Sequence, residues 1–295
     1  MPDPCAVSAA QRRQGAVWII LSAAGFGAMA VFAKLAYRDG VTLASMLFLR
    51  FALAGLLLAL WGQWRGMQWP RGRDLLWLMA MGGLGYVGQA YCYFSALRYA
   101  SAGMVGLLLY LYPALVVVLS AWLLKRPVGR SRIWAVVLAL AGTALTVGGD
   151  LHSETIGILL GIGAALIYSV YILVGEGVMQ RVSPLAAATV VILSAASVYA
   201  AGAFYEGLSL PASLNGWLAV TAIALFSTVL AILGFFKGME KLGAADASTL
   251  STMEPLITLL LAAVVLGESV MPIQLVGGAL ILGAVVYLAR LPLAR

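Results

Sequence analysis

Charged side chains are scarce in this sequence. Asp, Glu, Lys and Arg make up 10% of its 295 residues, whereas 63% of the residues are hydrophobic and the mean hydropathy is +1.02. Soluble domains carry about 25% charged residues, so this composition excludes an ordinary soluble protein. It predicts a membrane protein that crosses the bilayer many times.

Histidine and cysteine are nearly absent as well. The one histidine is His152, and the two cysteines are Cys5 and Cys92. An intramembrane hydrolase needs a nucleophile with a base or a cluster of metal ligands, and an ATP-driven pump needs a glycine-rich phosphate loop. None of these patterns occurs, so we expect no enzyme, no metal site and no cofactor. Cys5 lies near the terminus and Cys92 inside an apolar run, which makes a disulfide improbable.

Long apolar runs fill the rest of the chain. Their continuous Leu, Ala, Val and Gly content lacks the alternation of membrane β-strands, so an all-α protein is predicted. A cleaved signal peptide is the rival interpretation of residues 1–37, although this apolar run exceeds a typical signal core. The ten predicted spans, each close to the ~20 residues needed to cross a bilayer, are about 16–37, 42–62, 75–97, 102–124, 132–149, 156–178, 184–205, 213–237, 244–266 and 271–289.

Basic residues gather in alternate connections between these runs. Only Arg38 and Arg98 lie in the opposite connections, and Lys34 and Arg50 lie inside spans. Short loops rich in Lys and Arg stay in the cytoplasm, so both termini are predicted to be cytoplasmic and the membrane to be the bacterial inner membrane. The net charge of +7 is then an insertion signal, and no nucleic-acid partner is expected. The fourteen residues on the cytoplasmic side are Arg12, Arg13, Arg65, Arg71, Arg73, Lys125, Arg126, Arg130, Arg132, Arg181, Lys237, Lys241, Arg290 and Arg295.

The two halves of the chain resemble each other at an offset of 142 residues. Each half then holds five spans, and because five is odd, the second half must be inverted relative to the first. The sequence predicts a first repeat over 1–150 and a second over 151–295. The matched pairs include Pro113 with Pro255, Ala102 with Ala244, Leu119 with Leu261, Leu124 with Leu266, Phe26 with Tyr168, and Tyr93 with Phe235.

Several of these stretches resemble a known family. Residues 100–124, residues 243–248, Met253-Glu254-Pro255 and Leu266-Gly267-Glu268 are similar to the drug/metabolite transporter superfamily, in particular its ten-helix EamA-type branch and the YddG-like amino-acid exporters. The first half departs from the pattern, because it reads Leu124-Lys125-Arg126 where the second half has the Gly-Glu pair. The resemblance implies export of small metabolites from a central cavity that opens to each side in turn.

Two prolines mark the expected centre of the protein. Pro113 and Pro255 cannot donate a backbone hydrogen bond, so each predicts a helix kink and a freed carbonyl near mid-membrane. A harmless kink repaired by neighbouring hydroxyls would explain one such proline. Two at equivalent repeat positions favour a substrate site.

Glu254 directly precedes the second proline. A carboxylate at the bilayer centre costs on the order of 2.5–3.5 kcal/mol unless it faces a polar interior. Ser251, Glu254 and Thr258 share one helix stripe, which predicts hydroxyl neighbours for the carboxylate. Glu254 is expected to take the positive end of a substrate, or a proton in its place. The alternative is a permanent structural ion pair with Arg50 or Lys34.

Tyrosines supply the remaining candidate cavity residues. Such a lining offers apolar faces with hydroxyl tips, suited to amphipathic solutes and to cation–π contact with an ammonium group. Inert packing explains mid-span tyrosines equally well, and the tryptophans near span ends are interpreted as interfacial anchors. The candidates are Tyr86, Gln89 and Tyr93 on one face of the third span, Tyr110 and Tyr112 beside Pro113, and Tyr168 and Tyr171 on the sixth span.

These features together predict a secondary transporter that exports amino acids and related small metabolites by alternating access. A multidrug or organic-cation exporter, a passive channel and a lipid flippase remain as alternatives. The expected partners are a small-molecule substrate and membrane lipid, and the protein is expected to be a monomer.

Overall fold

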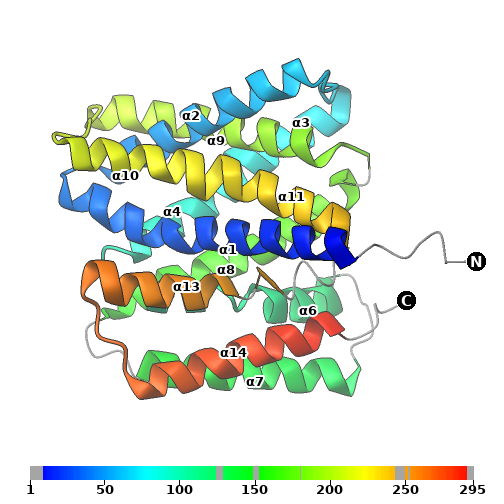
Figure 1. Cartoon of the computed structure of the whole chain (residues 1–295), viewed down its shortest axis with the longest axis vertical. Helices are drawn as coiled ribbons and strands as arrows, with labels where there is room; N and C mark the ends of the chain where they lie inside the picture. The colour runs from blue at the N-terminus through cyan, green and yellow to red at the C-terminus, as the bar shows by residue number, and fades with distance from the viewer. Residues whose placement is uncertain are drawn as a thin grey trace, which may run out of the picture.

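The computed structural model describes residues 9–123, 129–148, 153–179, 181–242, 250–251 and 253–290. Within these ranges the chain forms helices and no strand, which confirms the all-α prediction. The helices lie roughly side by side in one bundle (Figure 1). Most of the described residues of each predicted apolar run are helical.

The first half begins with two long helices, α1 (Ala9–Arg38) and α2 (Leu43–Trp64). The third run is divided into α3 (Gly72–Ala80), the π-helical segment η1 (Met81–Tyr86) and α4 (Val87–Ala96). The fourth is divided into α5 (Ala102–Leu109) and α6 (Tyr112–Leu123), and α7 (Arg130–Gly148) follows.

The second half repeats this order with α8 (Thr155–Met179) and α9 (Pro184–Glu206). Next come α10 (Leu214–Ala224), the π-helical segment η2 (Leu225–Leu230) and α11 (Ala231–Leu242). The last elements are α13 (Met253–Leu261), the π-helical segment η3 (Ala262–Leu266) and α14 (Pro272–Arg290). Ala244, part of the predicted repeat, lies outside the described residues.

Among the described residues, six helical stretches are long and apolar enough to cross a membrane, and three shorter apolar helices add to them. The six lie over 13–38, 43–64, 102–119, 155–175, 184–206 and 214–235. The chain is therefore a multi-pass membrane protein, as its composition predicts.

The packing of the helices relates the two halves. The helix pair α2 and α9 and the pair α7 and α14 each join equivalent positions of the repeat. Helix α1 packs on α11 and α13, and its counterpart α8 packs on α4, α5 and α6. Shifting η1 by 142 residues places it at 223–228, which overlaps η2, so both halves carry a π-helical segment at nearly the same place.

Pro113 lies in the first turn of a helical segment. Between α5 and α6 the amides of Tyr110 and Leu111 bond to carbonyls three residues back, at 3.1 Å each. Pro113 follows as the second residue of α6, where a missing N–H costs little. The predicted kink is thus a break in the helix at Tyr110–Leu111. Pro255 lies two residues into α13.

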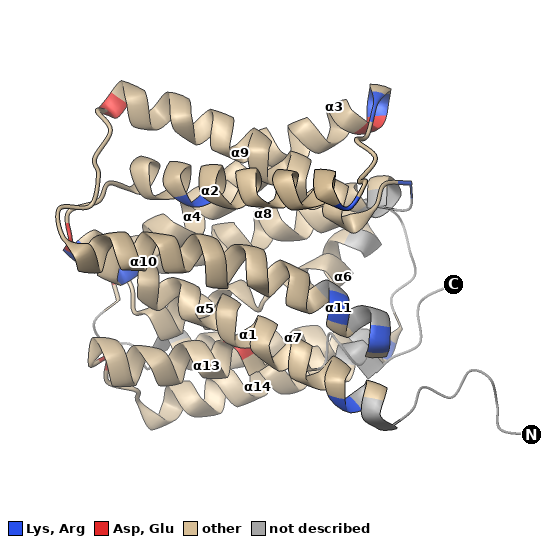
Figure 2. Cartoon of the chain, turned by 45° about the horizontal axis from the view of Figure 1, so that its top comes forward, with Lys and Arg blue, Asp and Glu red and all other residues tan. Residues whose placement is uncertain are grey.

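Charge is distributed unevenly over the two ends of the bundle. Figure 2 shows Lys and Arg gathered at the end where α1 begins and α14 ends. Asp and Glu, coloured red, lie mainly toward the opposite end, and one lies near the middle of the bundle.

Candidate functional site

Glu254 meets Tyr110 where the two halves of the chain touch. The Tyr110 hydroxyl lies 3.0 Å from the Glu254 carboxylate and 2.8 Å from the Ser251 carbonyl oxygen, so its single proton has two acceptors. Tyr110 sits at the break between α5 and α6, and Glu254 lies in the first turn of α13. Residues close to the two repeat-related prolines are therefore in direct contact.

Thr258 does not supply the hydroxyl expected beside this carboxylate. Its oxygen lies 2.9 Å from the Gly27 carbonyl oxygen and 3.1 Å from that of Glu254. Gly27 makes this approach possible, because a Cβ there would lie 2.8 Å from the Glu254 carbonyl oxygen. Helix α1 thus packs closely against the start of α13, and Tyr110 is the side chain that orients the carboxylate.

Neither candidate cation pairs with Glu254. The Lys34 ammonium lies 2.8 Å from Glu268, and the Nε of Arg50 donates to the Thr228 hydroxyl at 3.0 Å. A permanent ion pair with Lys34 or Arg50 is therefore not formed in this structure. The carboxylate is held by hydrogen bonding to a neutral phenol.

Aromatic rings form a continuous cluster that starts at Glu254. Apolar ring faces and hydroxyl tips of this kind suit an amphipathic solute, and the faces attract cations. The centroid distances along it are 6.1 Å for Tyr110–Tyr112, 4.9 Å for Tyr112–Tyr168, 6.0 Å for Tyr168–Tyr171, 6.1 Å for Tyr171–Tyr86, 5.3 Å for Tyr86–Phe51 and 5.7 Å for Phe51–Tyr199. We call these seven rings the aromatic cluster.

The other predicted site residues lie close to this cluster or inside the bundle. Gln89 and Tyr93 are buried on α4, and the ring of Tyr93 packs edge-on against Phe94 at 5.2 Å. Ser251 contributes its backbone carbonyl to Tyr110.

Sequence reasoning missed Phe51 and Tyr199 as members of the cluster, and Phe94 as a ring close to it. Phenylalanine has no polar tip to distinguish it from lipid-facing residues. Tyr199 is buried, and its hydroxyl donates to the Val87 carbonyl at 2.7 Å.

A second polar contact closes the bundle at the end opposite the start of α1. Glu268 accepts from the Lys34 ammonium and from the Ala102 backbone N–H at 2.9 Å, so it caps the first turn of α5. Gly267 makes this possible with a left-handed φ of +71°, which turns the chain after η3. We call Lys34, Glu268 and the start of α5 the end clamp.

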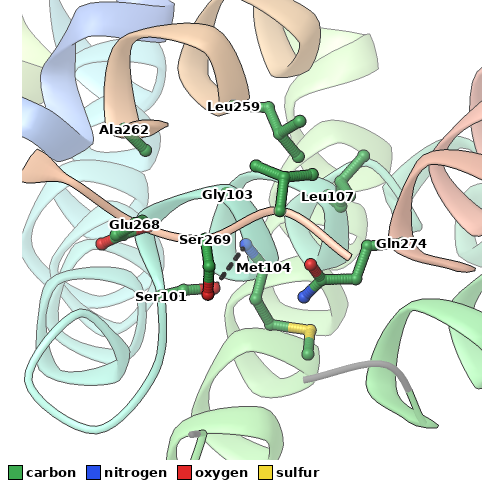
Figure 3. A pocket seen from close by; sticks show the side chains of 10 residues that line it. Ser101, Gly103, Met104, Leu107, Leu259, Ala262, Glu268, Ser269 and Gln274 are labelled. Atoms are coloured by element: carbon green, nitrogen blue, oxygen red, sulfur yellow. Dashed lines mark hydrogen bonds between the residues drawn. The ribbon is translucent and has the colours of Figure 1, made fainter. Parts of the chain in front are cut away.

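Figure 3 shows a small cavity beside the end clamp, with Ser101, Met104, Glu268 and Gln274 around it. Its volume of about 10 Å³ leaves room for no more than about one water molecule. The bundle is therefore closely packed at this end.

Comparison with known proteins decides the family. The model of the EamA-like transporter family matches residues 13–148 and again residues 155–290. The chain belongs to the EamA-like transporter family. It carries two copies of the EamA domain and is a membrane transport protein of the drug/metabolite transporter superfamily.

Curated relatives include three proteins named as amino-acid exporters. The chain is 27% identical to a probable terminal-alkyne amino-acid exporter of Streptantibioticus cattleyicolor, over 95% of each chain. It is 29% identical to the threonine/homoserine exporter RhtA of Escherichia coli, over 84% of each chain. It is 28% identical to the aromatic amino acid exporter YddG of Ancylobacter novellus, over 65% of this chain and 66% of the relative.

A solved structure described only as the crystal structure of a protein has the same fold. It matches with a TM-score of 0.67 at 23% sequence identity, and the match covers 93% of this chain and 96% of the other. This likeness extends to nearly the whole bundle.

Proposed function

We propose that this EamA-like transporter exports amino acids and related small metabolites across the bacterial inner membrane by alternating access. The observation that carries the proposal is the contact between Glu254 and Tyr110 at one end of the aromatic cluster. A carboxylate that is hydrogen-bonded but not ion-paired can receive an ammonium group, and aromatic rings beside it suit the apolar part of an amino acid.

A proton is the natural competitor of the substrate at Glu254. The carboxylate attracts an ammonium group only while it is ionised, so a bound proton and a bound substrate exclude each other. This exclusion couples export of a positively charged group to proton entry.

Alternating access requires two arrangements of the helices around one site. The proposal assigns ten spans to the chain, five in each of two inverted repeats over 1–150 and 151–295, with both termini in the cytoplasm and the protein as a monomer. The exchange-symmetric packing of the halves and the paired π-helical segments support it. The end clamp acts as the closure on the periplasmic side.

An organic-cation exporter is the second candidate, because the same carboxylate and rings would bind a drug-like cation. No specific contact among the described residues favours a channel or a lipid flippase.

Transport by the purified protein in proteoliposomes tests the proposal. The panel contains radiolabelled neutral, aromatic and cationic amino acids together with cationic drugs, each loaded inside or outside. Saturable flux of at least one amino acid, with acceleration by unlabelled substrate on the opposite side, is expected. Flux of cations alone would favour the organic-cation exporter. Flux that does not saturate would indicate a channel, and lipid movement without amino-acid flux would indicate a flippase.

A further inference from the structure

Arg50 is a buried cation that the proposed site does not yet use. It lies in the middle of α2 and is 2% exposed. Its guanidinium carbon lies 4.8 Å from the centroid of the Phe51 ring and 5.1 Å from that of Phe94. The side chain is therefore enclosed by aromatic faces, not directed to the membrane surface.

Both repeats hold the guanidinium in place. The Thr228 hydroxyl donates its own proton to the Ile223 carbonyl at 2.9 Å, so it is free to accept from the Nε of Arg50. Thr228 belongs to η2, and the ring of Tyr86, the last residue of η1, lies 5.3 Å from that of Phe51, which the guanidinium covers. The cation thus lies between the two repeat-related π-helical segments, which are frequent at functional sites.

Arg50 has no acidic partner in the part of the chain that the structure describes. The ion pairs there join Lys34 to Glu268 and Arg181 to Asp74. The printed contacts of its guanidinium are the rings of Phe51 and Phe94 and the Thr228 hydroxyl. Cation–π contact and neutral hydroxyl groups compensate only part of the cost of burying a full charge in a membrane.

Glu254 and Arg50 lie in contact with different members of the aromatic cluster. Tyr93 packs edge-on against Phe94, whose ring the Arg50 guanidinium covers. The aromatic cluster runs from Tyr110, bonded to Glu254, to Phe51, which stacks on Arg50. The bundle therefore encloses one negative and one positive pole that do not neutralise each other.

We propose that Arg50 binds the carboxylate of the transported molecule, so that the protein selects zwitterions over simple organic cations. The inference rests on the proposed function and names the substrate class. A guanidinium offers a planar pair of donors that matches a carboxylate, and an entering carboxylate supplies the missing counter-charge. Thr228 is a positioning residue that orients this donor pair.

The test compares an amino acid that the protein transports with its carboxamide and its decarboxylated amine, which keep the ammonium and lack the carboxylate. Proteoliposomes holding the wild-type protein should transport the amino acid at least tenfold faster than either analogue. Arg50→Gln should lower amino-acid transport at least tenfold and bring the ratio of the three rates close to one. Arg50→Lys keeps the positive charge but lacks the planar pair of donors, so it should raise KM more than it lowers kcat.

The matched control is Lys237→Gln, which removes a cation that also lies over an aromatic ring, Trp18 at 4.6 Å, outside the aromatic cluster. Its ratio of rates should equal that of the wild type. Thr228→Val should raise KM for the amino acid and leave transport of the amine unchanged.

Two results would overturn the role of Arg50: equal wild-type transport of the acid and its amide, or a folded Arg50→Gln variant that still discriminates as the wild type does. If Arg50→Gln fails to fold, the wild-type ratio and the Arg50→Lys kinetics decide. Absence of transport for acid, amide and amine alike would instead overturn the proposed function.

Discussion

At the residue scale, the important feature of Glu254 is that its carboxylate has a hydrogen-bond partner but no ion-pair partner. Its carboxylate bonds to the Tyr110 phenol, and the cations Lys34 and Arg50 are engaged elsewhere. A buried carboxylate that serves only structure would be expected to pair with one of these cations. Its hydrogen bond to a neutral group leaves the charge available to a ligand.

Replacing Glu254 with Gln should lower transport of amino acids and cationic substrates at least tenfold and remove its dependence on pH, because the amide cannot exchange a proton or attract an ammonium group. Flux in proteoliposomes at several pH values measures both effects. Glu206→Gln, an exposed acidic residue at the end of α9, is the control. A folded Glu254→Gln protein with unchanged rate and pH profile would make Glu254 a structural residue.

Tyrosines inside the cluster should matter more than tyrosines outside it. Tyr112→Ala and Tyr168→Ala each remove a ring from the contact at 4.9 Å, so a several-fold rise in KM is expected. Tyr287→Ala and Tyr91→Ala remove rings that are largely exposed on the bundle surface, and their KM values should stay within a factor of two. Initial rates over a substrate series provide the comparison, and similar effects in both sets would argue against the cluster as the substrate site.

At the element scale, the end clamp joins three helices that are distant in the sequence. Lys34 comes from the last turns of α1, the Ala102 amide begins α5, and Glu268 follows η3. A helix cap contributes about 0.5–2 kcal/mol, and the partly buried Lys34–Glu268 pair adds an electrostatic contribution that salt screens only in part.

Weakening the end clamp should open that end of the bundle. We expect Glu268→Gln to raise the reaction rate of a cysteine at position 269 with an impermeant maleimide about fivefold, since 1 kcal/mol changes a two-state ratio by roughly that factor. The measurement uses protein in which Cys5 and Cys92 are replaced by Ser, with Glu206→Gln as the control. An unchanged labelling rate would show that the clamp does not govern closure.

At the scale of the whole molecule, the charge distribution and the helix order make a topological prediction. Impermeant labels at positions 1, 68, 128, 182, 240 and 295 should react only from the cytoplasm, and labels at 40, 152, 208 and 269 only from the periplasm. The reason is that fourteen of the 18 basic residues fall on one predicted side. One pair of labels on the wrong sides would rule out the inverted repeat.

Much of the helical architecture can be predicted from local sequence patterns. Apolar runs of bilayer length dictate helices, because a backbone in lipid has to satisfy its own hydrogen bonds. The 142-residue offset predicts equivalent helices in two halves, and the structure adds η1 and η2 at nearly equivalent places. Proline chemistry marks the position of the break near Pro113, since the missing N–H is a property of one residue.

Which side chains meet was decided by tertiary packing alone. The sequence could not tell whether Lys34 or Arg50 would pair with Glu254, because charge partners across helices depend on how the helices rotate and cross. Packing assigned Lys34 to Glu268 and set Arg50 between the two halves, against Thr228 and two phenylalanines. A chain therefore specifies its helices through short-range patterns, whereas the pairing of buried charges emerges only when distant helices are in contact.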